Sequence, residues 1–188
     1  MLKMEEFSMK NKILITEAEI KARTMRVSME IDESYSSEIH DVHAVCVLKG
    51  SYMFYSDLMK NLSGITNRNY FTEFIKCSSY SGTETSGKVE FQYISFDPNG
   101  KDILLVEDII DTGITLQYLK QYLIERGAKS VRVVTLLNKC GRRLVDMKPD
   151  HYCFSVGPND FVIGYGMDYN ELYRSLPYVG LCIQEESI

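Results

Sequence analysis

The spacing of hydrophobic and polar residues changes repeatedly along the chain, and each change marks the border of an expected element. Hydrophobic residues recur at helical spacing in three segments, which predicts helices at 14–31, 51–62 and 114–127. Shorter apolar or alternating runs predict strands at 43–50, 69–77, 89–96, 102–107 and 130–138. Gly127 ends the third helical segment, as is typical of a helix stop. Strand, helix and strand over 102–138 form a βαβ unit, so we expect a parallel sheet with a right-handed crossover.

The segment between two of these strands, 78–88, is rich in Ser, Thr and Gly and has little to bury. This composition predicts a mobile loop. The run GTETSGKV at 82–89 fits the first seven positions of the P-loop motif, but Val89 stands where that motif needs Ser or Thr to hold magnesium. The residues that follow alternate like a strand, whereas a P-loop opens a helix. A nucleoside triphosphate site is therefore excluded here.

Composition narrows the classes of protein that fit. The 188 residues suit one globular domain, 1–188, and the net charge of −5 disfavours a general nucleic-acid binder. No apolar run reaches the roughly 18 residues of a membrane span, and the first residues lack the pattern of a signal peptide. The five cysteines are odd in number and contain no C-x-x-C pair, which argues against a zinc site or a disulfide framework. We expect reduced thiols in a cytoplasmic protein.

The stretch ILLVEDIIDTGITL, 103–116, carries the clearest chemistry. An apolar strand ends at Glu107 and Asp108, and the turn 111–115 leads into a helix. In open α/β sheets, ligands bind beyond the carboxyl ends of strands, where helix N-termini and free backbone N–H groups favour a phosphate. Gly113 would let the backbone approach it closely. The acids would repel a phosphate unless they face sugar hydroxyls, or a magnesium ion shared with a second phosphate group.

Acids at strand ends are often only solvated caps, and Asp-Thr-Gly alone occurs in many turns. The complete string resembles the phosphoribosyl-diphosphate (PRPP) signature of type I phosphoribosyltransferases. Further motifs stand in order around it: LKGSYMF, SSYSG, LLNKCGRR and DFVIGYGMDYNELYRSLPYVG. Together they resemble the hypoxanthine-guanine branch of that family over about residues 40–182. The resemblance implies the type I phosphoribosyltransferase fold, an α/β core at about 36–155 with a small hood from about 1–35 and 156–188.

By this resemblance, the protein is a purine salvage enzyme. It would join hypoxanthine or guanine, both 6-oxopurines, to PRPP with Mg²⁺, releasing IMP or GMP and pyrophosphate. The implied transition state resembles an oxocarbenium ion, so the departing pyrophosphate needs positive charge and the purine needs a proton acceptor. Members of the family are usually homodimers or homotetramers, which is the assembly expected here. No nucleic-acid or membrane partner is expected.

The resemblance also implies roles for individual residues. Asp111 matches the general base near purine N7, although an aspartate here could instead cap the helix, worth roughly 0.5–2 kcal/mol. Magnesium would be held by Glu107, Asp108 and Asp168. The residues matched to PRPP or nucleotide binding are Lys49, Gly50, Glu107, Asp108, Ile109, Ile110, Asp111, Thr112, Gly113, Ile114, Thr115 and Arg174. Those matched to purine binding are Lys139, Asp160, Phe161, Val162 and Asp168, and those matched to the lid are Ser79 and Tyr80.

Three of these matches carry specific expectations. Lys139 would donate to purine O6, which selects 6-oxopurines over adenine, although a single lysine is usually a solvated surface residue. The Lys49–Gly50 peptide is expected to be cis, as an implication of the family alone. Asp160 stands where some members carry a basic residue, so an inward-pointing carboxylate would disfavour the partly anionic xanthine.

Three other readings stay open at this stage. A regulatory relative that binds PRPP and RNA would need a basic face, which the net charge of −5 disfavours. A non-catalytic nucleotide-binding module would lack Asp111, Tyr80 or Lys139, and all three are present. A phosphoribosyltransferase for another base, xanthine or a pyrimidine, is the nearest enzymatic alternative.

Overall fold

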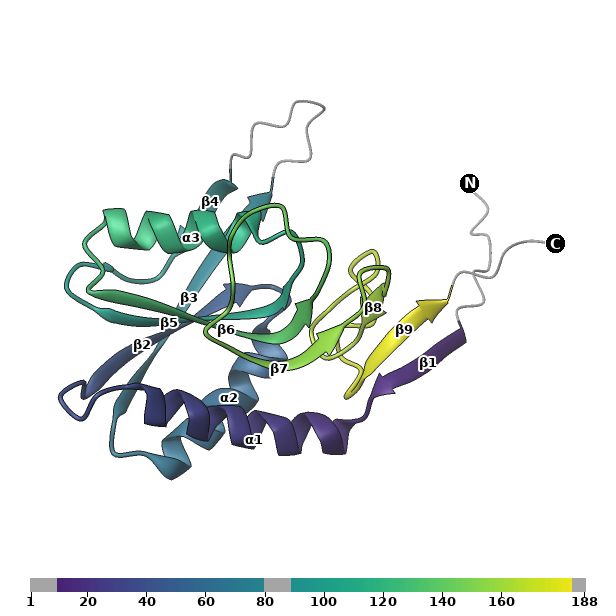
Figure 1. The fold of residues 1–188 in the computed structure, drawn as a ribbon, viewed down its shortest axis with the longest axis horizontal. Helices are drawn as coiled ribbons and strands as arrows, with labels where there is room; N and C mark the ends of the chain where they lie inside the picture. The colour runs from purple at the N-terminus through teal and green to yellow at the C-terminus, as the bar shows by residue number, and fades with distance from the viewer. Residues whose placement is uncertain (1–9, 80–88, 184–188) are drawn as a thin grey trace.

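The larger of two sheets forms the centre of the molecule. The computed structural model describes residues 10–79 and 89–183. In this part of the chain, six strands lie in the order β4-β3-β2-β5-β6-β7 (Figure 1). They are β2 (Asp41–Leu48), β3 (Asn69–Ser79), β4 (Val89–Ile94), β5 (Asp102–Ile110), β6 (Ser130–Lys139) and β7 (His151–Val156). Only β4 runs antiparallel to its neighbour, which confirms the predicted mostly parallel sheet.

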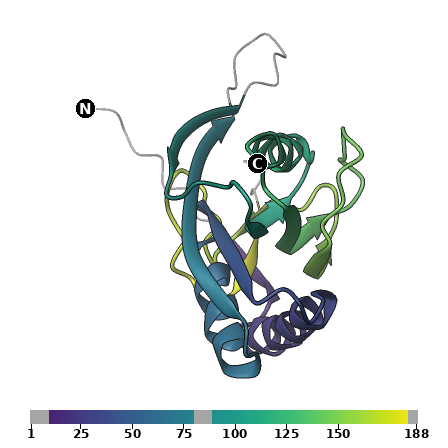
Figure 2. The same ribbon diagram turned by 90° about the vertical axis from the view of Figure 1, so that its left-hand side faces the viewer.

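Helices cover both faces of this sheet. The helices α1 (Glu17–Ser34) and α2 (Tyr52–Ile65) lie on one face, and α3 (Ile114–Glu125) lies on the other (Figures 1 and 2). The strand β5 is apolar on both sides for this reason. Its Leu104 and Val106 join the hydrophobic core under α1 and α2, whereas Ile103 and Leu105 join the core under α3.

A smaller antiparallel sheet joins the two ends of the chain. It has the order β1-β9-β8, with β1 (Lys10–Ile15), β8 (Val162–Ile163) and β9 (Val179–Ile183). Lys10 pairs with Ile183. We call these three strands, together with the turns at 164–178, the hood; it extends from one end of the large sheet (Figure 1). The helix α1 packs instead against α2 and β7.

Two element borders differ from the sequence prediction for identifiable reasons. The first helix begins at residue 17, because Thr16 caps it: Glu19 N donates to Thr16 Oγ1 at 3.3 Å, and Thr16 N donates to Glu19 Oε2 at 2.8 Å. The preceding residues are strand β1 rather than helix. The strand β5 continues to Ile110, so Glu107 and Asp108 lie inside a strand that pairs with β6 rather than after it.

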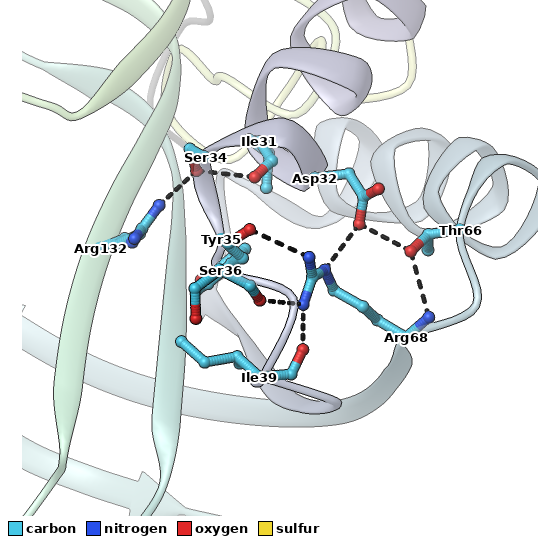
Figure 3. A network of polar contacts seen from close by, with 9 residues as sticks. All are labelled: Ile31, Asp32, Ser34, Tyr35, Ser36, Ile39, Thr66, Arg68 and Arg132. Atoms are coloured by element: carbon cyan, nitrogen blue, oxygen red, sulfur yellow. Dashed lines mark hydrogen bonds and ion pairs between the residues drawn. The ribbon is translucent and has the colours of Figure 1, made fainter.

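A buried arginine network fastens the edge of the sheet where β2 and β3 begin (Figure 3). Arg68 Nε donates to Asp32 Oδ1 at 2.9 Å, and its Nη2 donates to Tyr35 O at 3.0 Å. Its Nη1 donates to the carbonyl oxygens of Ser36 and Ile39. One guanidinium therefore ties the end of α1 to the residues that enter β2 and β3.

Candidate active site

A cleft of about 270 Å³ lies at the opposite edge of the sheet, where the parallel strands end. Its walls come from the carboxyl ends of β2, β3 and β5, the turn after β5 and the first turn of α3. The lining residues are Val47, Leu48, Cys77, Glu107, Ile109, Ile110, Asp111, Thr112, Gly113, Thr115 and Leu116. Seven of the residues predicted to bind PRPP are thus brought together here: Glu107, Ile109, Ile110, Asp111, Thr112, Gly113 and Thr115.

Two adjacent carboxylates stand at this edge. Asp108 N donates to Glu107 Oε1 at 3.0 Å, and Ile109 N donates to Asp108 Oδ1 at 2.5 Å. Burial, reinforced by the Asp108 carboxylate, raises the pKa of Glu107 well above its usual value. Burial also raises the pKa of Asp108, although hydrogen bonds and Arg174 act against it. The pair is therefore under electrostatic strain that a cation or a sugar hydroxyl would relieve.

The loop after β2 is pressed against this acid pair. A Cβ atom on Gly50 would lie 1.6 Å from Asp108 Oδ2, so only glycine fits there. The hood approaches from the other side: a Cβ atom on Gly166, whose φ is +102°, would lie 1.9 Å from Gly50 O. The loop thus packs on the Asp108 side chain through Gly50, and the hood packs on the backbone of the loop through Gly166.

The cis peptide expected in this loop is one residue earlier than predicted. It joins Leu48 to Lys49, and the prediction of a cis Lys49–Gly50 bond was wrong. Sequence reasoning could not separate the two bonds, because neither precedes proline, the one residue type that makes a cis bond recognisable from sequence.

The turn at 111–115 is held from behind by the segment that follows β6. Gly113 is the N-cap of α3 with φ +83°, and a Cβ on it would lie 2.9 Å from Arg143 Cδ and 3.1 Å from Val145 Cγ2. Leu144 N donates to Thr112 O at 3.0 Å. Gly113 has no side chain to cap α3, and Ile114 N donates to Thr112 Oγ1 only at a long 3.5 Å. The first backbone N–H groups of the helix can therefore turn to an anion. The alternative that Asp111 caps this helix is wrong.

Asp111 instead faces two cationic side chains. Its Oδ2 lies 3.6 Å from Lys139 Nζ and 3.5 Å from Arg142 Nη1. Its Oδ1 is buried and, within the described residues, has no hydrogen-bond partner. The Lys139 side chain is only 8% exposed. The reading of Lys139 as a solvated surface lysine is therefore wrong, because its ammonium group is buried beside a carboxylate at the cleft.

Three of the residues predicted to bind the purine, Asp160, Phe161 and Val162, lie where the chain enters the hood. Phe161 is 49% exposed and meets Tyr169 edge to face, with ring centroids 5.8 Å apart. Val162 is buried in β8. The Asp160 carboxylate accepts a hydrogen bond from Gly157 N at 2.7 Å, so it closes its own turn. An exposed aromatic face is thus presented beside a rigid strand.

The remaining predicted residues form an ion-pair cluster between the hood and the loop after β2. Arg174 Nη2 lies 2.8 Å from Asp168 Oδ1, and Lys49 Nζ lies 3.0 Å from Glu171 Oε2. Arg174 Nη1 also donates to Gly166 O at 2.8 Å. Hydrogen bonds from Lys49 and then Arg174 lower the pKa of Glu171. Both cations predicted to bind pyrophosphate are therefore paired with hood carboxylates.

Some residues were missed or lie elsewhere. Ser79 is the last residue of β3, and Tyr80 lies outside the described residues. Sequence reasoning did not single out Arg143 or Gly166, although both stand inside the motifs quoted above. The motif LLNKCGRR does not indicate where the side chain of its second arginine points. Gly166 is distinguished by its positive φ, which only the structure shows.

Comparison with known proteins agrees with this geometry. The family model described as "Phosphoribosyl transferase domain" matches residues 13–170. A hypoxanthine-guanine phosphoribosyltransferase of Lactococcus lactis is 42% identical over 90% of each chain. A hypoxanthine phosphoribosyltransferase of Escherichia coli is 40% identical over 91% of this chain and 94% of its own.

Solved structures extend the similarity to three dimensions. A hypoxanthine phosphoribosyl transferase of Trypanosoma cruzi superposes with a TM-score of 0.87 and 36% identity, covering 95% of this chain and 94% of its own. The match covers nearly the whole of both chains. The chain belongs to the phosphoribosyl transferase domain family.

Proposed function

We propose that the protein transfers the phosphoribosyl group of PRPP to hypoxanthine or guanine, forming IMP or GMP and pyrophosphate. The observation that carries this proposal is the pair formed by Asp111 and Lys139, 3.6 Å apart at the end of the sheet that also holds the amide-lined turn. A proton acceptor and a cationic donor at this spacing suit neighbouring positions of a 6-oxopurine, N7 and O6. The names of the Lactococcus lactis and Escherichia coli relatives support the same substrates.

The two ends of the sugar would meet different parts of the cleft. The 5′-phosphate would lie in the turn 111–115 against the start of α3, where backbone N–H groups and the helix dipole stabilise negative charge. Glu107 and Asp108 would accept hydrogen bonds from the ribose hydroxyls. Asp111 would take the proton from the purine and, as a carboxylate, stabilise positive charge that develops on the sugar.

The acid pair also fits a magnesium ion. Glu107 and Asp108 are adjacent oxygen donors whose mutual repulsion a divalent cation would relieve, and Asp168 would serve a second ion. Within residues 10–79 and 89–183, no group of three His, Cys, Asp or Glu side chains makes a site by itself. Magnesium usually combines one or two carboxylates with substrate oxygens, which is the arrangement proposed. The ion would neutralise charge on the diphosphate.

The leaving pyrophosphate would bind between the loop after β2 and the hood. Lys49 and Arg174 are the cations of this region, and the Gly50 backbone has no side chain to keep phosphate oxygens away. Ser79 and Tyr80 would belong to a lid that excludes water from the activated sugar.

The purine would lie against Phe161, with Ile109 on its other face and the Val162 backbone at its edge. Because Asp160 is tied to Gly157, its carboxylate would lower the potential near the base without contacting it. This arrangement supports hypoxanthine and guanine over xanthine, which carries partial negative charge. A regulatory PRPP-binding protein is the alternative from another class. Such a protein would need neither a proton acceptor at Asp111 nor a purine-binding cation at Lys139.

Two coarser features complete the proposal. None of the helices in the described ranges is long and apolar enough to cross a membrane. The cysteines Cys46, Cys77, Cys140 and Cys153 are free thiols, which supports action in the reducing cytoplasm. We further propose a homodimer or homotetramer, a matter for a mass measurement in solution.

A steady-state assay tests the function directly. Hypoxanthine, guanine, xanthine and adenine are each offered with PRPP, in the presence of Mg²⁺ and after its removal by a chelator. We expect IMP and GMP to form only with the metal, xanthine to react poorly and adenine to remain unchanged. Transfer to none of the four bases, with intact PRPP binding, would favour the regulatory alternative.

A further inference from the structure

The backbone pairing of β5 with β6 ends one residue before Asp111 and Lys139, the two residues proposed to contact the purine. The last paired residues of these strands are Ile110 and Asn138. Asp111 is the first residue after β5, and Lys139, the last residue of β6, pairs with Val156 of β7. Backbone pairing between β5 and β6 therefore does not fix the distance between Asp111 and Lys139. Something else must hold the two strand ends at a constant separation if both side chains are to meet one purine.

Arg143 spans this gap. Its Nη1 donates to the backbone oxygen of Asp111 at 2.6 Å, and its Nη2 donates to Asn138 Oδ1 at 2.7 Å. A single planar guanidinium thus binds the peptide that carries Asp111 and the residue just before Lys139. Because the fork is rigid, it sets the spacing of its two partners more strictly than two separate side chains would.

Arg143 is itself held in place on both sides. Its Cδ lies against Gly113, where a Cβ would come within 2.9 Å. The backbone of the next residue, Leu144, donates to Thr112 O at 3.0 Å. The aliphatic part of the Arg143 side chain therefore packs on the turn, and its guanidinium binds the backbone of Asp111 rather than the carboxylate. In this it differs from Arg142, which approaches Asp111 Oδ2 directly.

We propose that Arg143 is a positioning residue that replaces the missing rung between β5 and β6, and so fixes Asp111 relative to Lys139. This inference rests on the proposed function, since it assigns the spacing to the N7 and O6 atoms of one purine ring. It predicts that loss of the guanidinium damages purine use specifically. The turn that takes the 5′-phosphate keeps its own anchor through Thr112 and Leu144, so PRPP binding is preserved.

The test compares Arg143→Met, which retains an apolar stem but has no donor, with the wild type and with Arg26→Met. Arg26 is exposed on α1, on the other face of the sheet, and serves as the matched control. A misplacement of about 1 Å can cost on the order of 100-fold in rate. We expect kcat/KM for hypoxanthine to fall by roughly 10- to 100-fold, with the KM for PRPP within about twofold of wild type.

A second pair of measurements separates positioning from stability. Arg143→Ala should regain activity when guanidinium ions are added at non-denaturing concentration, whereas methylammonium at the same concentration should not restore it. Asn138→Ala removes the other end of the bridge and should give a smaller loss of the same kind, even if the Arg143 variants fold poorly. Thermal unfolding of each variant shows what fraction is folded.

The outcomes are distinct. Equal losses for purine and PRPP would assign Arg143 a merely structural role and overturn the proposal, as would unchanged purine constants in both Arg143→Met and Asn138→Ala. If the wild type transfers to no purine, the proposed function fails and takes this inference with it. An active wild type with a purine-specific defect in the variants supports both.

Discussion

Gly50 and Asp108 are in such close contact that a Cβ atom on Gly50 would lie 1.6 Å from Asp108 Oδ2. Gly50→Ala must therefore displace either the loop after β2 or the acid pair. We expect the variant to lose most activity and to unfold at a lower temperature than the wild type. Gly64→Ala is the matched control, because nothing lies within 4 Å of its Cβ position in α2. That variant should gain roughly 0.5–1 kcal/mol in stability. An active Gly50→Ala protein would contradict the close contact.

Asp111→Asn should fold normally and still lose turnover. The amide keeps the size of the carboxylate but cannot accept a proton, and general-base catalysis contributes about 10²–10⁴-fold. We expect kcat to fall by at least about 100-fold while the KM for PRPP changes little. Steady-state kinetics measure both, with the exposed Asp146→Asn as the control. Unchanged turnover would remove Asp111 from the role of base.

Lys139→Ala should affect the purine more than PRPP. Hydrogen bonds to charged groups contribute about 1.5–3 kcal/mol, so we expect the KM for hypoxanthine and guanine to rise at least about tenfold. The KM for PRPP should stay within about threefold, and Lys148→Ala, an exposed lysine, should behave like the wild type. A larger effect on PRPP than on the purines would reassign Lys139 to phosphate binding.

Glu107→Gln should stabilise the protein without ligand while reducing its activity. Burial and Asp108 raise the pKa of Glu107, so the ionised side chain is disfavoured in the folded state. Its native pKa lies above the unfolded value, and stability is therefore lost as the pH rises through this interval. We expect Glu107→Gln to raise Tm by a few degrees at pH 8, about 1 kcal/mol, and by much less near pH 4. Thermal unfolding at both pH values measures the difference; a lower Tm at pH 8 would contradict it.

Arg68→Ala should destabilise the fold at a distance from the cleft. The substitution leaves the Asp32 carboxylate and three carbonyl oxygens without their shared donor. The Arg68 and Asp32 side chains are 13% and 25% exposed, and hydrogen bonds to charged groups contribute about 1.5–3 kcal/mol, a loss of stability that urea unfolding would detect. The exposed Arg26→Ala should lie within about 0.5 kcal/mol of wild type. A change in KM without a change in stability would be unexpected, because Arg68 lies at the opposite edge of the sheet.

The sequence predicted the central βαβ unit well, because strongly apolar strands and the Gly127 that follows the helix are local signals; α3 ends at Glu125, two residues earlier than predicted. It predicted neither β1 nor the strands after residue 139. The strand β8 has only two residues, and β1 exposes Ile13 and Leu14, so their pairing depends on partners far away in the chain. The capping box of Thr16 and Glu19 is a local signal that marks the start of α1.

The residues of the cleft were predicted to lie together where they belong to one short motif. The turn 111–115 was placed correctly, whereas the contact of Gly50 with Asp108 and the bridge from Arg143 to Asn138 join separate segments. Such contacts depend on the tertiary packing of strands and loops that are distant in the sequence. A local pattern of residue types does not predict this packing.

The pairing of β1 with β9 has a consequence for how the protein is made. The ribosome makes β1 before any strand of the six-stranded sheet, whereas its hydrogen-bonding partner β9 is made after all of them. The six-stranded sheet includes no strand from the smaller sheet, so its backbone pairing can form while the edge of β1 is still open. Nascent chains should therefore acquire a protease-resistant core before they acquire the part that would enclose a substrate.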